Sequence, residues 1–328
     1  MLKILLTIIL LSSLLISQSL SSTLTQRGGE HNALFLNPTY LINSKSTQGR
    51  IESDLINSSL TIDKQSLNFI KELNQADNNQ EISKLLKENI GNTLTLSANN
   101  FSSIYQTKKK IAYSIGVVNS INGYFITHSG FGSKRAMETS VEKNRALIGT
   151  VVAKQDNLHY GLNLKVIEKS QTLYNYAINE MATQDSIWDY FDNSHTQKES
   201  ALGLDMGITY TLPQNIFNSK LSFAILDIGN TSFKELASTE QSTTIGLSFE
   251  PKDTYIKIDY LDNHLRADIS KEFFNQKLKL HSGFIYKALS LGVSYKFSIF
   301  NIALFSYKVK AYNQNRERKN ELSVAVTW

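Results

Sequence analysis

The side chains that could do chemistry are six histidines and scattered serines and carboxylates, in a chain without cysteine. The histidines show no metal-ligand spacing such as HExxH, and no Gly-rich phosphate loop or GxSxG serine motif occurs. We therefore predict no metal, no cofactor and no enzymatic activity, and keep a Ser/His/Asp hydrolase as an alternative. The histidines are His31, His128, His159, His195, His264 and His281.

Charged residues recur at every second position in several segments, as in Arg266 with Asp268 and Lys257 with Asp259. Alternate residues of a strand share one face, so each pair would lie on the same side of a sheet. Opposite charges that neutralise each other suit the crowded interior of a small barrel. We expect this interior to be lined by His159, Lys165, Asp205, Lys257, Asp259, Arg266, Asp268 and Lys296.

The elements that would position these residues are amphipathic strands. Residues 201–212 place Leu202, Leu204 and Met206 on one face and Gly203 and Asp205 on the other. Similar alternation recurs along the chain and gives about fourteen strands, mostly near the ~9–11 residues that cross a bilayer. The polar face carries Gly, Ser, Thr and paired charges, which favours a barrel lumen over the solvent face of a sandwich. We predict an all-β fold, a transmembrane antiparallel β-barrel occupying residues 47–328.

The last strand ends the chain on an aromatic residue. Leu322, Val324, Val326 and Trp328 would share one face of it. An amphipathic closing strand is typical of bacterial outer-membrane barrels, where one face meets lipid. The expected partners are therefore outer-membrane lipid and the barrel-assembly machinery.

Composition limits the other classes of protein. The chain has 328 residues, 41% of them hydrophobic, and only three prolines. This is too polar for a bundle of membrane helices but normal for a barrel, in which alternate residues meet lipid. The net charge of +5 is spread among acidic residues, with no basic run beyond 108–110, so we expect no nucleic-acid partner.

Residues 1–20 have the features of a cleavable signal peptide. Lys3 provides the positive charge, residues 4–16 are apolar, and serines follow. The alternative is an uncleaved anchor, for which the apolar stretch is short. Export without a second hydrophobic helix, together with the strand pattern, predicts location in the outer membrane of a Gram-negative cell.

The connections between strands should alternate in length. In a barrel of this type the turns on the periplasmic side are short and the outer loops are long. The connections after even-numbered strands are short, and the long ones, among them 63–92 and 170–198, follow odd-numbered strands, although two odd connections, near 262–264 and 286–288, are also short. Residues 63–92 read as a helical hairpin that either packs on the rim or forms a lid, and 170–198 as a long outer loop containing a second helical segment, 174–191.

Residues 21–46 precede the first strand and contain Gly28, Gly29, Asn37 and Pro38. The glycines permit tight turns, and Asn37-Pro38 favours an extended or turn conformation over a helix. The residues alone suggest an irregular apolar segment, possible as a plug in the lumen.

This Gly-containing segment leading to Asn37-Pro38 resembles the hatch of FadL-type outer-membrane transporters, although Thr39-Tyr40-Leu41 replaces the family's Ala-Gly-Leu. The hatch, the hairpin after the first strand, residues 203–210, 222–230 and 258–261, and the closing strand resemble more closely the conjugal transfer TraF-like outer-membrane family. The resemblance implies a barrel of about fourteen strands with a plug in its lumen.

From this resemblance we expect a passive channel for small hydrophobic molecules, with Gly28, Gly29, Asn37 and Pro38 in the hatch. The alternative is a non-transporting outer-membrane scaffold that serves secretion or conjugal transfer. The ligand of the channel would be a hydrophobic small molecule that partitions through without an energy source.

Overall fold

The computed structural model describes residues 37–43, 51–76, 79–128, 137–176, 196–213, 217–261, 264–285, 288–310 and 316–327. The expected signal peptide, Gly28, Gly29 and Trp328 lie outside the described residues. No helix among the described residues is long and apolar enough to span a membrane.

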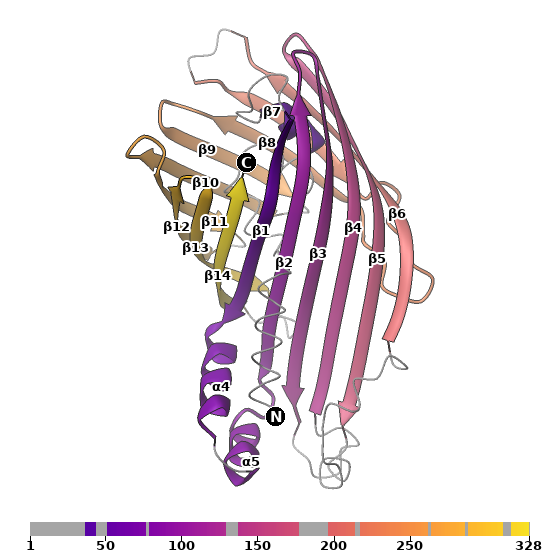
Figure 1. The fold of residues 1–328 in the computed structure, drawn as a ribbon, viewed down its shortest axis with the longest axis vertical. Helices are drawn as coiled ribbons and strands as arrows, with labels where there is room; N and C mark the ends of the chain where they lie inside the picture. Colours follow the sequence, from indigo (N-terminus) through magenta and orange to yellow (C-terminus); the bar gives the residue numbers. More distant parts are fainter. Residues whose placement is uncertain are drawn as a thin grey trace.

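The chain forms a closed antiparallel barrel in which each strand pairs with its neighbours in sequence and β14 pairs with β1 (Figure 1). The prediction of an all-β barrel of about fourteen strands is confirmed. The strands are β1 (Ile51–Asp63), β2 (Thr93–Thr107), β3 (Ile111–Thr127), β4 (Met137–Gln155), β5 (Leu158–Tyr176), β6 (Thr196–Thr211), β7 (Lys220–Leu226), β8 (Ser242–Phe249), β9 (Thr254–Leu261), β10 (His264–Phe273), β11 (Leu278–Ile285), β12 (Ala288–Phe297), β13 (Phe300–Lys310) and β14 (Arg316–Thr327).

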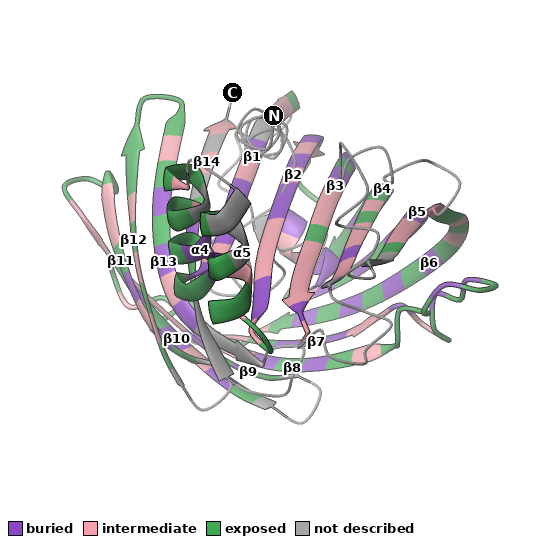
Figure 2. Ribbon diagram, turned by 90° about the horizontal axis from the view of Figure 1, so that it is seen from below, coloured by how far each residue is buried: buried purple, intermediate pink, exposed green. Residues whose placement is uncertain are grey.

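Burial alternates along the strands, which gives the striped ribbons of Figure 2. In β6, Asp205 and Thr209 are fully buried, whereas Leu202 is 69% exposed and Leu204 and Met206 are also exposed. We call the buried alternation the inward series and the exposed one the outward series. Large apolar side chains on the outward series are the reverse of a water-soluble protein and are typical of a barrel surrounded by lipid.

Strands β2 to β6 contain 15 to 19 residues and are longer than the sequence pattern indicated. The expected loop 170–198 is correspondingly shorter, because residues 170–176 and 196–198 belong to β5 and β6. The polarity of the outward residues explains the difference. In β4 these residues are apolar at Leu147 and Val151, which form part of an apolar band, and charged at Lys143 and Arg145. Strand pairing therefore continues beyond the end of the apolar band. Of the helical segment expected at 174–191, the first three residues are strand and the rest lie outside the described part.

The two ends of the barrel carry different connections. Short connections follow the even-numbered strands, at 108–110, 156–157, 250–253 and 298–299 among others. The long ones follow odd-numbered strands, as the sequence predicted. We call the end with the short connections the terminal rim, because β1 begins and β14 ends there, and the opposite end the helical rim.

The helical rim carries α4 (Lys64–Gln75) and α5 (Asn79–Glu88) between β1 and β2 (Figure 1). Asp63 is the N-cap of α4, and its carboxylate accepts hydrogen bonds from the backbone N–H of Ser66 at 2.7 Å and the hydroxyl of Thr95 at 2.8 Å. These bonds satisfy an otherwise free helix donor and tie α4 to β2. Phe69 and Leu85 pack with Leu94, so the two helices rest on the barrel wall.

Candidate functional site in the barrel lumen

A short helical segment, η1 (Pro38–Asn43), lies inside the ring of strands (Figure 2). It is a 3-10 helix, which corrects the expectation of an extended or turn conformation. Asn37 starts it as an N-cap, because its side-chain oxygen accepts from the N–H of Thr39 at 3.0 Å and its carbonyl accepts from the N–H of Tyr40. Pro38 then occupies the first helical position, where its fixed φ is favourable and its missing N–H costs nothing.

Two glycines, which have no side chains, leave space for η1 against the barrel wall. Gly161 of β5 and Gly207 of β6 are register partners on the inward series. A Cβ on Gly161 would lie 2.7 Å from both the Cβ of Pro38 and the backbone N of Thr39, and one on Gly207 would collide with the side-chain amide of Asn37. Only residues without a side chain permit this approach of η1 to the wall.

Hydrogen bonds fix η1 on this wall. The hydroxyl of Thr39 lies 2.6 Å from that of Thr209, which in turn lies 3.1 Å from that of Ser222. The side-chain amide of Asn37 donates to the carbonyl of Phe223 at 3.3 Å. Asn37 and Thr39 are buried, so these bonds satisfy groups that would otherwise lack partners.

The apolar side of η1 faces a different part of the wall. Leu41 is fully buried in a cluster with Tyr105, Ala112 and Val152, which belong to β2, β3 and β4. A second apolar cluster, Phe101 with Val118, Ile148 and the partly buried Ala146, lies further along the same three strands toward the helical rim. Phe101 precedes Tyr105 by four residues, a distance of about 13 Å along a strand. The lumen wall of β2 to β4 therefore carries two apolar patches, with the buried Ser103, Ser114 and Thr150 between them.

The opposite wall is polar and charged. The ring of Tyr40 lies 5.0 Å from Nζ of Lys257, and Lys257 forms an ion pair with Asp259 at 2.9 Å. Lys257 and Asp259 are register partners of Asp268 and Arg266 on β10. Each of the four is 5% exposed, and their formal charges cancel. The charge set predicted from alternate positions is thus assembled on one wall, in contact with η1 through Tyr40.

A second buried charge set is centred on Lys165. Its ammonium lies 2.6 Å from a carboxylate oxygen of Asp205 and 2.6 Å from one of Asp227. Asp205 also accepts from the side-chain amide of Asn163 at 3.0 Å and the backbone N–H of Asp227 at 2.9 Å, and Asp227 accepts from the hydroxyl of Thr231. One ammonium group therefore contacts two carboxylates, and hydrogen bonds from neutral groups further stabilise the negative charge of these carboxylates.

The residues after Asp227 fold into the barrel. Thr231 and Thr239 pair through two backbone hydrogen bonds, and Phe233 and Leu236 between them are buried. The ammonium of Lys169 on β5 donates to the carbonyl of Ala237 at 3.1 Å, and the carboxylate of Glu199 on β6 accepts two backbone N–H groups of the segment. We call residues 227–241 the inward loop, because both contacts come from the inward series.

The other predicted site residues lie as follows. His159 is buried on the inward series of β5. Lys296 is exposed near the end of β12, away from the two charge sets. Leu322 is exposed and Val324 and Val326 are half-buried on the outward series of β14.

His281 bears on the hydrolase alternative. Its Nε2 lies 3.4 Å from the hydroxyl of Ser294, longer than the ~2.6–3.2 Å of an activated serine. Its ring instead packs edge-on against Phe305. Within the described ranges, no three His, Asp or Glu residues are grouped so as to hold a metal ion.

Sequence reasoning did not identify the residues that seat η1 or the inward loop. Gly161 and Gly207 each follow the polar alternation of their strands, but their pairing depends on the register between β5 and β6. In the sequence, Asp227 directly follows the alternating residues of β7. Its positive φ of 51°, with Gly229 and Asn230 following at positive φ, ends β7 and turns the chain into the lumen. The Asp-Ile-Gly-Asn sequence is the signal that indicates such a turn.

No protein-family model matches the chain, and no curated protein matches it. Among solved structures, a deltaS2 mutant of the monoaromatic hydrocarbon channel TodX is similar, with a TM-score of 0.55 and 12% identity over 91% of this chain and 93% of that chain. CdiB from Escherichia coli has a TM-score of 0.39 and 10% identity over 88% and 69% of the two chains. A mutant Rh. blastica porin has a TM-score of 0.34 and 9% identity over 85% and 100%.

At these identities the likeness concerns the fold alone, and the two lower scores carry no argument. The chain has a fold of the outer-membrane β-barrel type.

Proposed function

We propose that the chain is a passive outer-membrane channel for small hydrophobic molecules, closed by η1. The observation that carries the proposal is the pair of apolar patches on the lumen wall of β2 to β4, one around Leu41 and one around Phe101, Val118 and Ile148 nearer the helical rim. A hydrophobic molecule entering from the helical rim would meet this wall and then η1. The resemblance to FadL-type and TraF-like proteins and the hydrocarbon channel of similar fold support this function.

The attachment of η1 suits a gate. It is a single six-residue segment, and few hydrogen bonds hold Asn37 and Thr39 to β6 and β7. A ligand that competes with Leu41 for the apolar wall would favour the displaced state, because it binds that state only. Partition into the lumen then supplies the driving force, and no energy source, cofactor or catalytic group is required.

The proposal places the chain in the outer membrane with the helical rim outside the cell. The short connections of the terminal rim and the long ones of the helical rim support this orientation, since periplasmic turns in such barrels are short. Outer-membrane lipid and the barrel-assembly machinery are the partners that the orientation requires. No reaction is proposed for the lumen charges, among which Lys257 pairs with Asp259 and Lys165 with Asp205 and Asp227.

Uptake by whole cells tests the function. Cells that carry the gene should take up radiolabelled toluene and long-chain fatty acids faster than cells that lack it, and deletion of residues 37–43 should accelerate uptake further, because the apolar wall is then open. Labelled glycerol, a small polar solute, is the control. In each strain its uptake rate should be the same with and without toluene or fatty acid present. Equal toluene and fatty-acid uptake in all three strains would reject transport and favour the scaffold alternative.

A further inference from the structure

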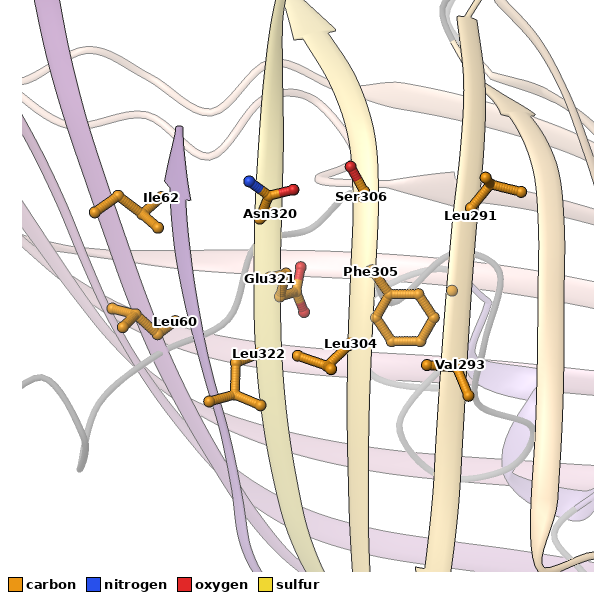
Figure 3. Close-up of a pocket in the computed structure, with 11 residues that line it drawn as sticks. Leu60, Ile62, Leu291, Val293, Leu304, Phe305, Ser306, Asn320, Glu321 and Leu322 are labelled. Atoms are coloured by element: carbon orange, nitrogen blue, oxygen red, sulfur yellow. The ribbon is translucent and has the colours of Figure 1, made fainter. Parts of the chain in front are cut away.

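An apolar groove of about 500 Å³ lies on the barrel wall where β12, β13, β14 and β1 are side by side (Figure 3). Leu304 and Leu322, which line it, belong to the outward series and are 53% and 42% exposed. Such a surface is what the acyl chains of the bilayer require, so the groove indicates no specific ligand. The polar groups that call for a ligand lie inside the lumen.

One polar position between the two apolar patches of β2 to β4 has no hydrogen-bond partner. Ser114 of β3 is 3% exposed, and its hydroxyl makes no hydrogen bond within the part of the chain that the structure describes. Its register partner on β4, Thr150, lies between Ile148 of one patch and Val152 of the other. Buried hydroxyls are seldom left without a partner, because they have lost water and gained nothing in exchange.

A chain of hydrogen bonds fixes the direction of the Thr150 hydroxyl. Asp205, which is ion-paired with Lys165, accepts hydrogen bonds, so the amide nitrogen of Asn163 faces it at 3.0 Å. The carbonyl oxygen of Asn163 then faces Thr150 and accepts its proton at 2.7 Å. Because Thr150 has given up its single proton, its oxygen presents only lone pairs to the lumen. The Ser114 hydroxyl has both a proton and lone pairs to offer.

We propose that this position binds a small hydrophobic molecule that carries one uncharged hydroxyl group, an alcohol or a phenol. The ligand hydroxyl donates to Thr150 and accepts from Ser114. The Cβ atoms of such register partners lie about 4.5–5.5 Å apart, a gap that one oxygen can bridge with two hydrogen bonds. The apolar body of the ligand lies on the patch of Phe101, Val118 and Ile148. The inference rests on the proposed function, since it names the substrate class that the channel favours.

The same geometry disfavours two other classes of ligand. A hydrocarbon leaves the Ser114 proton and the Thr150 lone pair without partners. A carboxylate has no proton to donate to Thr150. It would also lie near Lys165, Asp205 and Asp227, where one cation against two carboxylates gives a formal charge of minus one. A hydroxyl is uncharged and is both donor and acceptor, so it meets all these conditions.

Fluorine NMR titration of the detergent-purified full chain measures this preference. The probes are para-fluorophenol and para-fluorotoluene, which differ only in a hydroxyl in place of a methyl group, and protein-free micelles are the blank. The variant S114A should weaken the binding of para-fluorophenol roughly two- to twelvefold, because one hydrogen bond between uncharged groups is lost. Its affinity for para-fluorotoluene should be unchanged.

Ser270→Ala is the matched control. Ser270 of β10 is also buried and its hydroxyl also lacks a partner among the described residues, but it lies on the charged wall, two residues from Asp268. S270A should therefore bind both probes like the native chain. Variants of Thr150 test the other half of the site. T150V keeps the volume without the oxygen and should lose affinity for para-fluorophenol alone, whereas T150S keeps the oxygen and should not.

Three results would overturn the proposal: an unchanged affinity of S114A for para-fluorophenol, the same loss for both probes or in S270A, and no binding of either probe to the native chain. The titration is independent of uptake by cells, so the two hypotheses fail separately. Gene-dependent toluene uptake, with S114A binding both probes like the native chain, would reject the hydroxyl site alone. Selective binding without gene-dependent uptake would reject transport and leave the site.

Discussion

Replacing Lys165 with methionine is expected to destabilise the barrel by about 3–5 kcal/mol, the usual cost of removing one partner from a buried ion pair. The ammonium of Lys165 contacts both Asp205 and Asp227, and its side chain is 10% exposed. Methionine fills a similar volume but leaves two buried carboxylates without their cation. Equilibrium unfolding in urea, in the presence of lipid vesicles, measures the change in the free energy of unfolding.

The same substitution should release the inward loop before the barrel unfolds. Asp227 begins this loop and is held both by Lys165 and by the bond from its N–H to Asp205. Hydrogen exchange of residues 227–241 should therefore accelerate selectively in K165M. In the triple variant K165M/D205N/D227N most of the stability should return, since amides carry no charge that needs compensation.

Lys296→Met is the matched control for this experiment. Lys296 is exposed near the end of β12, so its replacement should change the free energy of unfolding by less than about 0.5 kcal/mol. If K165M and K296M proved equally stable, the buried charge set would not hold the inward loop.

Valine in place of Gly161 is expected to open the lumen. A Cβ at this position would lie 2.7 Å from Pro38 and Thr39, so η1 has to leave the wall or the wall has to yield. Overpacking of this kind costs about 1–3 kcal/mol, which moves the ratio of docked to displaced η1 by roughly fivefold to 150-fold. Single-channel conductance in planar bilayers and uptake of labelled toluene should both rise.

Gly149→Val provides the comparison. Gly149 lies on β4, and a Cβ there would have no atom within 4 Å. G149V should therefore conduct like the native chain. A closed pore in G161V, with G149V unchanged, would mean that the glycine pair does not seat a gate.

The barrel could be predicted from the sequence because its signal is repeated. Alternation such as Leu202, Leu204 and Met206 against Gly203 and Asp205 recurs in strand after strand, and each strand pairs with its neighbour in sequence. Closure of the sheet then requires no long-range information beyond strand order. The placement of Lys257 with Asp259 and of Arg266 with Asp268 follows from the same two-residue period.

The contacts that η1 makes with the two sides of the lumen could not be predicted from the sequence. The seat of η1 depends on Gly161 and Gly207 being opposite each other and on three-dimensional contact with residues more than a hundred positions away. The apolar patches were also missed, because Phe101 and Tyr105 share the inward series of β2 with the polar Asn99 and Ser103. Periodicity separates the two faces of a strand but does not reveal which part of an inner wall is apolar.

The charged network around Lys165 shows the same limit. Lys165 and Asp205 were expected in the lumen from their alternation, whereas Asp227 enters only because the chain turns inward after β7. A turn changes which residues meet, and the two-residue period carries no information about residues beyond a strand end.

Spin-label accessibility in lipid vesicles tests most directly whether the outward series meets hydrocarbon. The chain has no cysteine, so single cysteines can be introduced and labelled at Leu162, Leu164, Leu204 and Met206, with Lys143 as the position beyond the apolar band. The four apolar positions should be relaxed by oxygen and shielded from a water-soluble nickel chelate, and Lys143 should show the reverse. Free access of the nickel chelate to the four apolar positions would contradict a membrane-spanning barrel.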